Sequence, residues 1–272
     1  MKKAFYLRKE LAAAWQDKDV FSLLKTLPGE VFRDKEGRRT LRFERAGQSY
    51  FLKYHAGVGW GEITKNLLQL RMPIISARNE WQAVQRLHEL GIGTMTLAGY
   101  GERGLNPARR ESFVITDELT GTMSLEFVGQ QWQQRKPSFR SKQILIRKLA
   151  EMSRKMHQAG INHRDYYLCH LLLTEDFAEH NQISEDTELF LIDLHRTQIR
   201  RRVPTRWLVK DLGSLYFSAH EVKLSQRDKF RFIQHYSGLT LRQALNTQDD
   251  FWRKVEARAQ RLLQEWHRHN PS

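Results

Sequence analysis

The feature that most constrains the fold is an acidic loop placed directly after an amphipathic helix pattern. Four apolar residues recur at spacings of 4, 3 and 4, on one face of a helix: Leu145, Leu149, Met152 and Met156. Gly160 stands where a helix C′ glycine belongs, and His163-Arg164-Asp165 follows on an expected loop. Two short apolar runs at 171–173 and 189–192 predict a hairpin, and Asp193 comes directly after them.

This order of acids is typical of protein-kinase-type phosphotransferases. In such enzymes the first Asp accepts the proton of the attacking hydroxyl, and the second holds Mg²⁺ on the phosphates of ATP. We therefore predict Asp165 and His163 as catalytic residues and Asp193 as a metal ligand. His170 is a second metal candidate, because a protein kinase has a metal-binding Asn there, although imidazole is a poor ligand for Mg²⁺. The alternative is a solvated turn with an unrelated acid at a strand end.

The rest of the chain predicts a sheet followed by helices. Strand patterns occur at 30–33, 40–44, 49–54, 95–100 and 112–116. Helix patterns occur at 8–26, 77–90, 124–132, 141–158, 210–220, 225–236, 240–246 and 248–268. This order predicts an α+β, protein-kinase-like fold with two lobes. We expect a small antiparallel-sheet lobe with one main helix at 1–118, and a larger, mainly helical lobe with the catalytic and metal-binding loops at 119–272.

The expected small lobe carries candidates for nucleotide binding. A kinase needs a Lys on the third strand for the α- and β-phosphates and a helix Glu that orients it, and Lys53 and Glu80 occupy these places. Where a protein kinase has its Gly-rich loop, this chain has one glycine followed by Arg38 and Arg39. We predict all four as nucleotide contacts, with Lys53 also catalytic, and add Glu118 from the segment that joins the lobes. For the two arginines, an exposed basic turn is the alternative.

The charge of the chain indicates a polyanionic partner. The 272 residues include 45 Lys and Arg against 31 Asp and Glu, a net charge of +14. Six of these cations lie between Asp193 and Asp211, in a stretch that faces the acceptor in a kinase: Arg196, Arg200, Arg201, Arg202, Arg206 and Lys210. We predict the five arginines as acceptor-binding residues for an anionic acceptor. We also expect Asp211 to anchor the catalytic loop from a helix.

Several segments together resemble the bacterial lipopolysaccharide core heptose(I) kinases. They are 38–42, 50–53, 65–68, 79–81, 160–173, 192–198 and 210–218, and the matches span about residues 15 to 240. The resemblance implies a protein-kinase-like fold, use of ATP and Mg²⁺, and phosphate transfer to the first heptose of the lipid A–core molecule. It implies that Asp165 is the catalytic Asp and that His170 is a family trait. The family usually has Cys where this chain has Tyr166.

The resemblance also implies a place at the cytoplasmic face of the inner membrane, with the lipopolysaccharide core acceptor and the anionic membrane surface as partners. The single cysteine, Cys169, suits a reducing cytosol, and no apolar run is long enough to span a bilayer. We therefore expect a cytoplasmic protein held peripherally at the membrane. The insert at 55–75 is a candidate docking element, with Trp60, Ile63, Leu67 and Leu70 near Lys65 and Arg71. An ordinary packed insert is the alternative for that stretch.

Two other functions remain open from the sequence. The catalytic residues do not define the acceptor, so the chain is alternatively a kinase-like enzyme for another sugar, a small molecule or a protein tyrosine. A non-enzyme alternative is a binding module for a polyanion such as an acidic acyl carrier protein, which is also a candidate partner of the kinase. Retention of Lys53, Glu80, Asp165 and Asp193 argues against a module without catalysis, and we do not expect nucleic acid as a partner.

Overall fold

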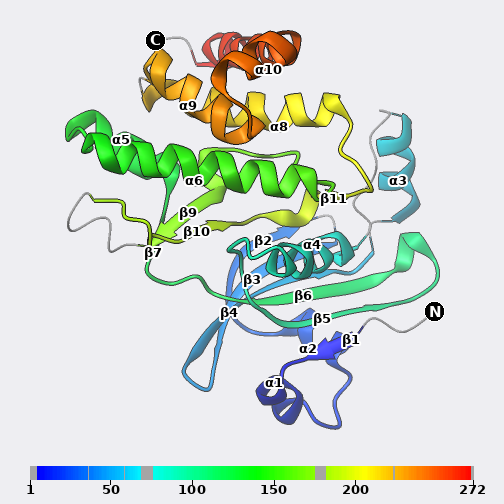
Figure 1. Ribbon diagram of the computed structural model, residues 1–272. Helices are drawn as coiled ribbons and strands as arrows, with labels where there is room; N and C mark the ends of the chain where they lie inside the picture. Colours follow the sequence, from blue (N-terminus) through cyan, green and yellow to red (C-terminus); the bar gives the residue numbers. More distant parts are fainter. Residues whose placement is uncertain are drawn as a thin grey trace. The chain divides into compact units, whose positions relative to one another are not determined.

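The computed structural model describes residues 5–35, 37–57, 59–68, 76–174, 182–222 and 224–270. The chain divides into two compact units, drawn as ribbons in Figure 1. The first, here called the sheet unit, comprises Met1–Arg86, Met95–Thr120 and Leu194–Arg196. The second, here called the helical unit, comprises Leu87–Thr94, Gly121–Asp193 and Thr197–Ser272.

The sheet unit is built on a six-stranded antiparallel sheet with the order β1-β5-β6-β4-β3-β2. Its strands are β1 (Phe5–Leu7), β2 (Glu30–Lys35), β3 (Arg38–Arg45), β4 (Gln48–His55), β5 (Leu97–Arg103) and β6 (Glu111–Asp117). The five predicted strands are confirmed as β2 to β6. The prediction missed β1, because three residues are too few to show an alternating pattern, and only pairing with β5 makes them a strand.

Four longer helices and one short one accompany this sheet: α1 (Lys9–Ala14), α2 (Val20–Thr26), α3 (Gly59–Leu68), α4 (Arg78–Glu89) and η1 (Pro107–Arg109). The single helix predicted at 8–26 is wrong, because the chain turns at Asp17, which has a φ of 62°. The side chain of Asp19 then caps α2 by accepting from the backbone N–H of Phe21. The break lets both short helices turn their apolar sides to the sheet.

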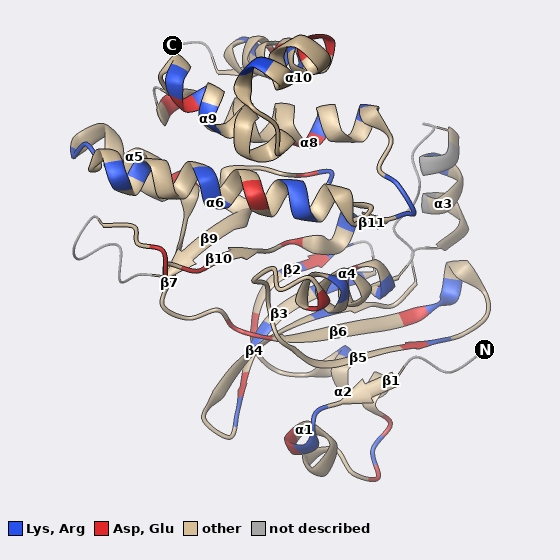
Figure 2. Cartoon of the chain, in the orientation of Figure 1, with Lys and Arg blue, Asp and Glu red and all other residues tan. Residues whose placement is uncertain are grey.

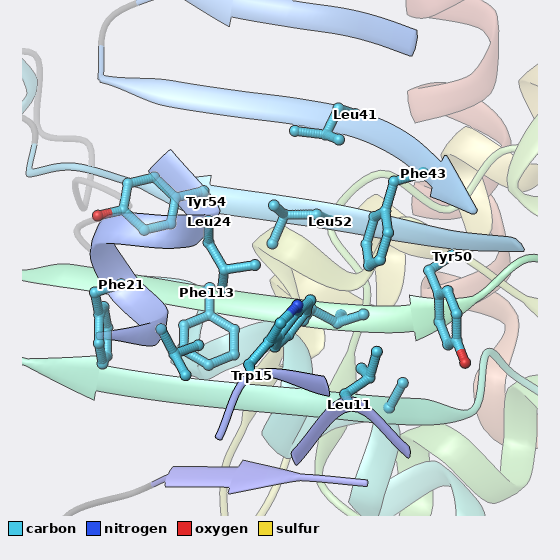
Figure 3. Close-up of a cluster of buried hydrophobic side chains, with 13 residues drawn as sticks. Leu11, Trp15, Phe21, Leu24, Leu41, Phe43, Tyr50, Leu52, Tyr54 and Phe113 are labelled. Carbon is cyan, nitrogen blue, oxygen red and sulfur yellow. The ribbon is translucent and has the colours of Figure 1, made fainter. Parts of the chain in front are cut away.

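Figure 3 shows the resulting core of the sheet unit. Leu11 of α1 and Leu24 of α2 lie against the face of the sheet that carries Leu41, Leu52 and Ile115. These three strand residues are paired in register across β3, β4 and β6, so their side chains leave the sheet on the same side. All five are fully buried, so this core fixes the strand that carries Lys53.

The insert predicted as a docking element at 55–75 is only partly described. Its helix α3 carries Trp60 with 58% of its surface exposed, whereas Ile63 is buried. The positions of Leu70 and Arg71, and the side chain of Leu67, lie outside the described residues. Membrane docking by this segment therefore stays a prediction.

The helical unit holds five long helices: α5 (Leu125–Gln134), α6 (Phe139–Gln158), α8 (Thr205–Ser218), α9 (Gln226–Ser237) and α10 (Leu241–His269). Short strands and turns lie between them: β7 (Thr122–Ser124), β8 (Ile161–Asn162), η2 (Leu168–His170), β9 (Leu171–Thr174), β10 (Leu189–Leu191), β11 (Gln198–Ile199) and η4 (His220–Val222). The remaining turn, η3 (Leu194–Arg196), belongs to the sheet unit. Strands β9 and β10 confirm the predicted hairpin.

The predicted helices of this unit are confirmed with two corrections. Helix α8 begins at Thr205, several residues before the predicted start at 210. Pro204 stands at its N-cap, where its missing N–H costs the helix no hydrogen bond. The two helices predicted at 240–246 and 248–268 form one element, α10, with non-helical backbone only at Gln248. Within the described ranges no helix combines the length and the apolar character that crossing a bilayer requires.

Helix α6 positions the acidic loop, because its apolar face is buried within the helical unit. Leu149, Met152 and Met156 are at most 9% exposed, as the sequence pattern predicted. The helix ends at Gln158, and Gly160, two residues further on, has a φ of 81° and redirects the chain into β8. A cavity of about 330 Å³ borders α6 in the same unit, and its apolar lining includes Leu125, Val128, Trp132, Leu149, Leu215 and Trp252.

Candidate active site

Lys53 and Glu80 form an ion pair in the sheet unit. Lys53 lies on β4, Glu80 lies in the first turn of α4, and Lys53 Nζ is 2.7 Å from Glu80 Oε1. Glu80 is 1% exposed, whereas the side chain of Lys53 is 27% exposed. A buried carboxylate is costly unless a cation or hydrogen-bond donors accompany it, so the pair stabilises Glu80. Glu80 in turn holds the ammonium group, while part of the Lys53 side chain stays accessible.

Arg38 and Arg39 open strand β3, next to the β2–β3 turn. Arg39 donates from Nη1 to the carbonyl of Lys25 at 3.1 Å, and its Nε lies 3.6 Å from a carboxylate oxygen of Asp34. Its charge therefore already has partners within the protein. Arg38 is paired across the sheet with His55, and burial together with the charge of Arg38 lowers the pKa of His55 to about 3.

Glu118, the remaining predicted nucleotide residue, faces strand β3. Its Oε2 accepts a hydrogen bond from Arg42 Nε at 2.8 Å, and its backbone N–H donates to the carbonyl of Ser49. A hydrogen bond from the Ser49 side chain, followed by the Arg42 guanidinium, holds the pKa of the Glu118 carboxyl below its usual range. The Glu118 side chain thus binds a residue of strand β3, whereas the sequence predicted that it contacts a nucleotide.

Asp211 anchors the loop that carries Asp165. It lies on α8, is fully buried, and accepts the backbone N–H groups of His163 at 2.7 Å and Arg164 at 2.8 Å. His157, at the end of α6, lies 3.3 Å from the same carboxylate. The predicted anchoring role of Asp211 is confirmed by these contacts. The anchor also holds Arg164 at a φ of 76°, a conformation that costs a non-glycine residue free energy.

His163 occupies a buried position behind the loop. The residue is fully buried, and its Nε2 lies 2.9 Å from the carbonyl oxygen of Ile192, so Nε2 carries the proton and donates. Burial lowers the pKa of His163, which keeps the ring neutral. The predicted catalytic role conflicts with this placement, because a fully buried ring whose N–H is bound to the backbone has no exposed atom for a substrate. Its contact instead fixes the residue that precedes Asp193.

His170 connects Asp165 and Asp193. Its Nδ1 donates to the carbonyl of Asp165 at 2.7 Å, and its Nε2 lies 3.6 Å from Asp193 Oδ2. Burial disfavours the imidazolium ion, but contacts with Cys169, the Asp165 carbonyl and the Asp193 carboxylate outweigh it and raise the pKa of His170 to about 9. The two contacts tether the ring between Asp165 and Asp193, and the role of His170 as a metal ligand stays a prediction.

Asp193 has the chemistry that a magnesium ion needs. Its side chain is 31% exposed and offers carboxylate oxygens, the donor atoms that Mg²⁺ prefers. Among the described residues no group of three or more His, Cys, Asp or Glu side chains is gathered as a metal site. The Asp193 carboxylate therefore fits an ion that binds through one or two carboxylates and the phosphates of a nucleotide.

The arginines between Asp193 and Asp211 lie in different environments. Arg200 and Arg206 lie against the ring of Trp207 in the helical unit, with Cζ atoms 5.8 and 5.4 Å from the ring centroid. Arg201 and Arg202 are exposed, and Figure 2 shows the blue of Lys and Arg along this loop into α8. Arg196 belongs to the sheet unit. Of the five arginines predicted to bind the acceptor, the structure therefore gathers two around one aromatic ring.

Sequence reasoning did not place Arg164 or Trp207 in the site, and it counted Lys210 among the cations of the acceptor-facing stretch without predicting it as a binding residue. Lys210 Nζ lies 4.0 Å from Asp165 Oδ1, and both Lys210 and Arg164 lie against Trp207. The spacing of Trp207 and Lys210, three residues apart in a helix, was a signal that they share a face. It was lost because the predicted helix began only at residue 210.

The sheet unit thus carries a Lys–Glu pair, and the helical unit carries an anchored Asp loop and a second Asp after a hairpin. These parts define a protein-kinase-like phosphotransferase. The family model for the lipopolysaccharide kinase (Kdo/WaaP) family matches residues 22–236, and the chain belongs to this family. The prediction of a phosphotransferase, over a module without catalysis, is thereby confirmed.

Named relatives agree with this assignment. The chain is 48% identical over 256 residues to "Lipopolysaccharide core heptose(I) kinase WaaP" of Escherichia coli K12, covering 94% of this chain and 96% of that protein. It is 46% identical over 258 residues to the protein of the same name from Pseudomonas aeruginosa, covering 95% of each. A solved structure, "WaaP in complex with acyl carrier protein", matches with a TM-score of 0.81 and 41% identity over 95% of this chain and 98% of that chain. The predicted fold class and the resemblance are confirmed.

Proposed function

We propose that this chain is a lipopolysaccharide core heptose(I) kinase that transfers a phosphoryl group from ATP to the first heptose of the inner core. The observation that carries the proposal is the anchored Asp165 loop, in a chain that is 48% identical over 256 residues to a heptose(I) kinase. The Lys53–Glu80 pair supports the use of ATP.

We assign the proton transfer to Asp165. Its carboxylate accepts the proton of the heptose hydroxyl as the new oxygen–phosphorus bond forms and the bond to the departing ADP breaks. His170 orients the loop through the Asp165 carbonyl, and His163 orients the backbone before Asp193. Lys53, held by Glu80, binds the phosphates of the nucleotide. Mg²⁺, when held by Asp193 and the phosphates, would neutralise charge that develops during transfer.

The test is phosphate transfer from γ-labelled ATP to lipid A–core acceptors that lack phosphate on the first heptose. We expect label on that heptose alone, shown by mass spectrometry of the isolated core. A panel containing a second core sugar, free heptose and a tyrosine peptide covers the alternative acceptors. Label on a panel member in preference to the first heptose would reject the proposed acceptor. The Asp165→Asn variant is the matched control for contaminating kinases.

We also propose that the protein works at the cytoplasmic face of the inner membrane, as a peripheral protein. The net charge of +14 supports attraction to an anionic lipid surface, an effect that falls steeply with ionic strength. Flotation with vesicles of anionic and of zwitterionic lipid measures this directly. Binding to the anionic vesicles that salt reverses is expected, and equal behaviour with both lipids would reject it.

An acidic acyl carrier protein is the further partner that we propose. The support is the related solved structure of WaaP in complex with acyl carrier protein, together with the basic character of this chain. The apolar cavity in the helical unit would suit an acyl chain, since its lining includes Val128, Trp132 and Trp252. Calorimetry with acylated and unacylated carrier protein tests both points. We expect the acylated form to bind more tightly, and Val128→Asp to remove that difference.

A further inference from the structure

His157 connects two other helices of the helical unit through the two nitrogens of its ring. It lies near the end of α6, and its Nε2 is 3.3 Å from Asp211 Oδ2 on α8. Its Nδ1 is 2.9 Å from the hydroxyl oxygen of Tyr236 on α9. All three side chains are buried, and Asp211 in turn binds the loop of Asp165. Tyr236, His157 and Asp211 are called the loop support below.

The protons of the loop support follow from the chemistry of its groups. Asp211 Oδ2 accepts the backbone N–H of His163, and a carboxylate has no proton to give, so His157 Nε2 carries a proton and donates to it. Burial, with Asp211 and Tyr166 nearby, raises the pKa of Tyr236, so its hydroxyl keeps its proton. A protonated hydroxyl can donate to a bare Nδ1 or accept from a protonated one. Tyr236 therefore holds the His157 ring in one orientation in either form.

The orientation of the Asp211 carboxylate decides where the loop lies. Each of its oxygens accepts one backbone N–H of the loop, from His163 and from Arg164. The last torsion angle of an Asp or His side chain has broad, roughly two-fold minima, so neighbours must select one orientation. Arg164 also has a φ of 76°, a conformation that persists only while such contacts hold it. A carboxylate that turned would therefore release the backbone directly before Asp165.

The ring of Tyr236 is held by packing that does not involve its hydroxyl. The ring centroids of Phe232, Phe251 and Trp252 lie 6.0, 6.5 and 5.5 Å from its own. A buried hydroxyl costs free energy unless it is hydrogen-bonded, and a phenylalanine would fill the same space. The contact with His157 is the use that the structure gives to this hydroxyl. Tyr236→Phe therefore removes that contact and leaves the aromatic packing in place.

We propose that Tyr236 and His157 are positioning residues for phosphoryl transfer, because they fix the Asp211 carboxylate and thereby the backbone that carries the reacting acid. The inference rests on the proposed function, since it takes Asp165 as the base. Both residues are buried, so they act through Asp211 and contact no substrate. A displaced base slows proton transfer. Binding of ATP and of the acceptor, which involves other residues, is unaffected.

Single-turnover kinetics of Tyr236→Phe test the proposal. With ATP and acceptor saturating, the rate constant of phosphoryl transfer should fall by about 10- to 100-fold, the range for groups that orient a functional residue from behind. The apparent dissociation constants of ATP and acceptor should stay within about twofold of the parent values. Parent-like transfer in Tyr236→Phe, or weaker substrate binding at a parent-like rate, would overturn the proposal.

Tyr166→Phe is the matched control. Tyr166 is fully buried and comes directly after Asp165. Its hydroxyl lies 2.8 Å from Ser153 Oγ, which itself donates to the carbonyl of Leu149. The substitution removes one buried hydroxyl contact beside the loop but none from the loop support, so the transfer rate constant should stay within about threefold of the parent. An equal fall in both variants would show that loss of any buried hydroxyl is responsible, and would refute the positioning role.

A double-mutant cycle tests whether the hydroxyl acts through the ring. His157→Leu removes both ring nitrogens, so Tyr236→Phe should lower the transfer rate constant much less in that background than in the parent. Effects of the two substitutions that multiply would show that the residues act separately, contrary to the proposal. If His157→Leu does not fold, amide exchange in Tyr236→Phe decides the question.

Amide hydrogen exchange observes the loop support without turnover. In Tyr236→Phe the backbone N–H groups of His163 and Arg164 should exchange about tenfold faster than in the parent. The N–H of Ala259, in the buried part of α10, should keep its rate, and faster exchange there as well would mean general destabilisation and reject the proposal. Faster loop exchange, with no heptose phosphorylated by the parent, would reject the proposed acceptor and keep the positioning role. Normal phosphorylation with parent-like loop exchange would reject the positioning role alone.

Discussion

Two non-glycine residues of the candidate site adopt left-handed backbone conformations. Arg164 has a φ of 76° and Asp193 has a φ of 59°. Such conformations cost free energy and persist only where surrounding contacts hold them. Asp211 supplies those contacts for the first residue, and the hydrogen bond from His163 to Ile192 supplies one beside the second. The backbone on each side of the chemistry is therefore held by buried polar groups.

Substitution of Asp165 by Asn tests the proposed base. An amide keeps the shape of the side chain but cannot take the proton of the hydroxyl. We expect kcat to fall by about 10²- to 10⁴-fold, the range for a positioned acid or base. Nucleotide affinity, measured by calorimetry, and the melting temperature should stay close to those of the parent. Turnover within a few-fold of the parent would remove Asp165 from the mechanism.

The Lys53–Glu80 pair allows stability and activity to be separated. Lys53→Met removes the ammonium group that lies 2.7 Å from the buried Glu80 carboxylate. The variant should lose no more unfolding free energy than the about 3–5 kcal/mol that a broken buried pair costs, because Lys53 is partly exposed. The double variant Lys53→Met/Glu80→Gln removes the buried charge as well. It should regain most of the free energy of unfolding in urea titrations but none of the activity. Recovery of activity would show that Lys53 has no catalytic part.

The connection from α6 through Gly160 to β8 determines where the acidic loop begins. The backbone N–H of Arg200 donates to the carbonyl of Gly160, and a Cβ atom on Gly160 would overlap with the carbonyl oxygen of Arg200. Gly160 is therefore needed both for its positive φ and for the close approach of another segment. The same approach brings Arg200 to the ring of Trp207.

Gly160→Ala and Gly121→Ala form a matched pair. Both glycines have a positive φ, but nothing lies within 4 Å of a Cβ added to Gly121. Gly121→Ala should cost only the conformational penalty, about 1–2 kcal/mol. Gly160→Ala should cost clearly more and lower kcat, since β8 or β11 must move away. Equal losses of unfolding free energy in the two variants would contradict the close packing described here.

Across the molecule, buried neutral histidines link stability to pH. Burial, with Arg38 and Lys53 nearby, lowers the pKa of His55 to about 3, and burial lowers that of His163 as well. Below an ordinary pKa of about 6.5 the unfolded chain binds protons that the folded chain does not. Stability is therefore fully present above about pH 6.5 and falls as the pH decreases towards 3.

The His55→Gln variant measures this effect. Between about pH 6.2 and 5.2 one such histidine contributes up to about 1.4 kcal/mol of unfolding free energy per pH unit. Urea titrations should show a pH dependence smaller by up to that slope in His55→Gln. The same substitution at His88, an exposed position of α4, is the control. An unchanged slope in His55→Gln would mean that His55 takes up its proton in the folded protein.

The acidic loop and the elements beside it illustrate what local sequence patterns can predict. The helix with Leu149, Met152 and Met156 on one face, its end at Gly160 and the hairpin before Asp193 all follow from residues that are neighbours in the chain. The order of the acids and the Lys–Glu pair were predicted in the same way. Their chemistry depends on residue type and on a framework of helices and strands that such spacing already defines.

Contacts between distant segments decided the rest. Strand β1 exists through its partner β5, and the buried His163 finds its hydrogen-bond partner in the carbonyl of Ile192, 29 residues further along the chain. Of the six cations between Asp193 and Asp211, no spacing rule selects the three that lie against Trp207. Arg164 is 43 residues away from Trp207 in the chain, and folding alone brings the two together. Residue type and spacing determined the elements and the reacting groups, whereas burial and long-range packing determined which charges face one another, because desolvation and Coulomb energies depend on distance in space.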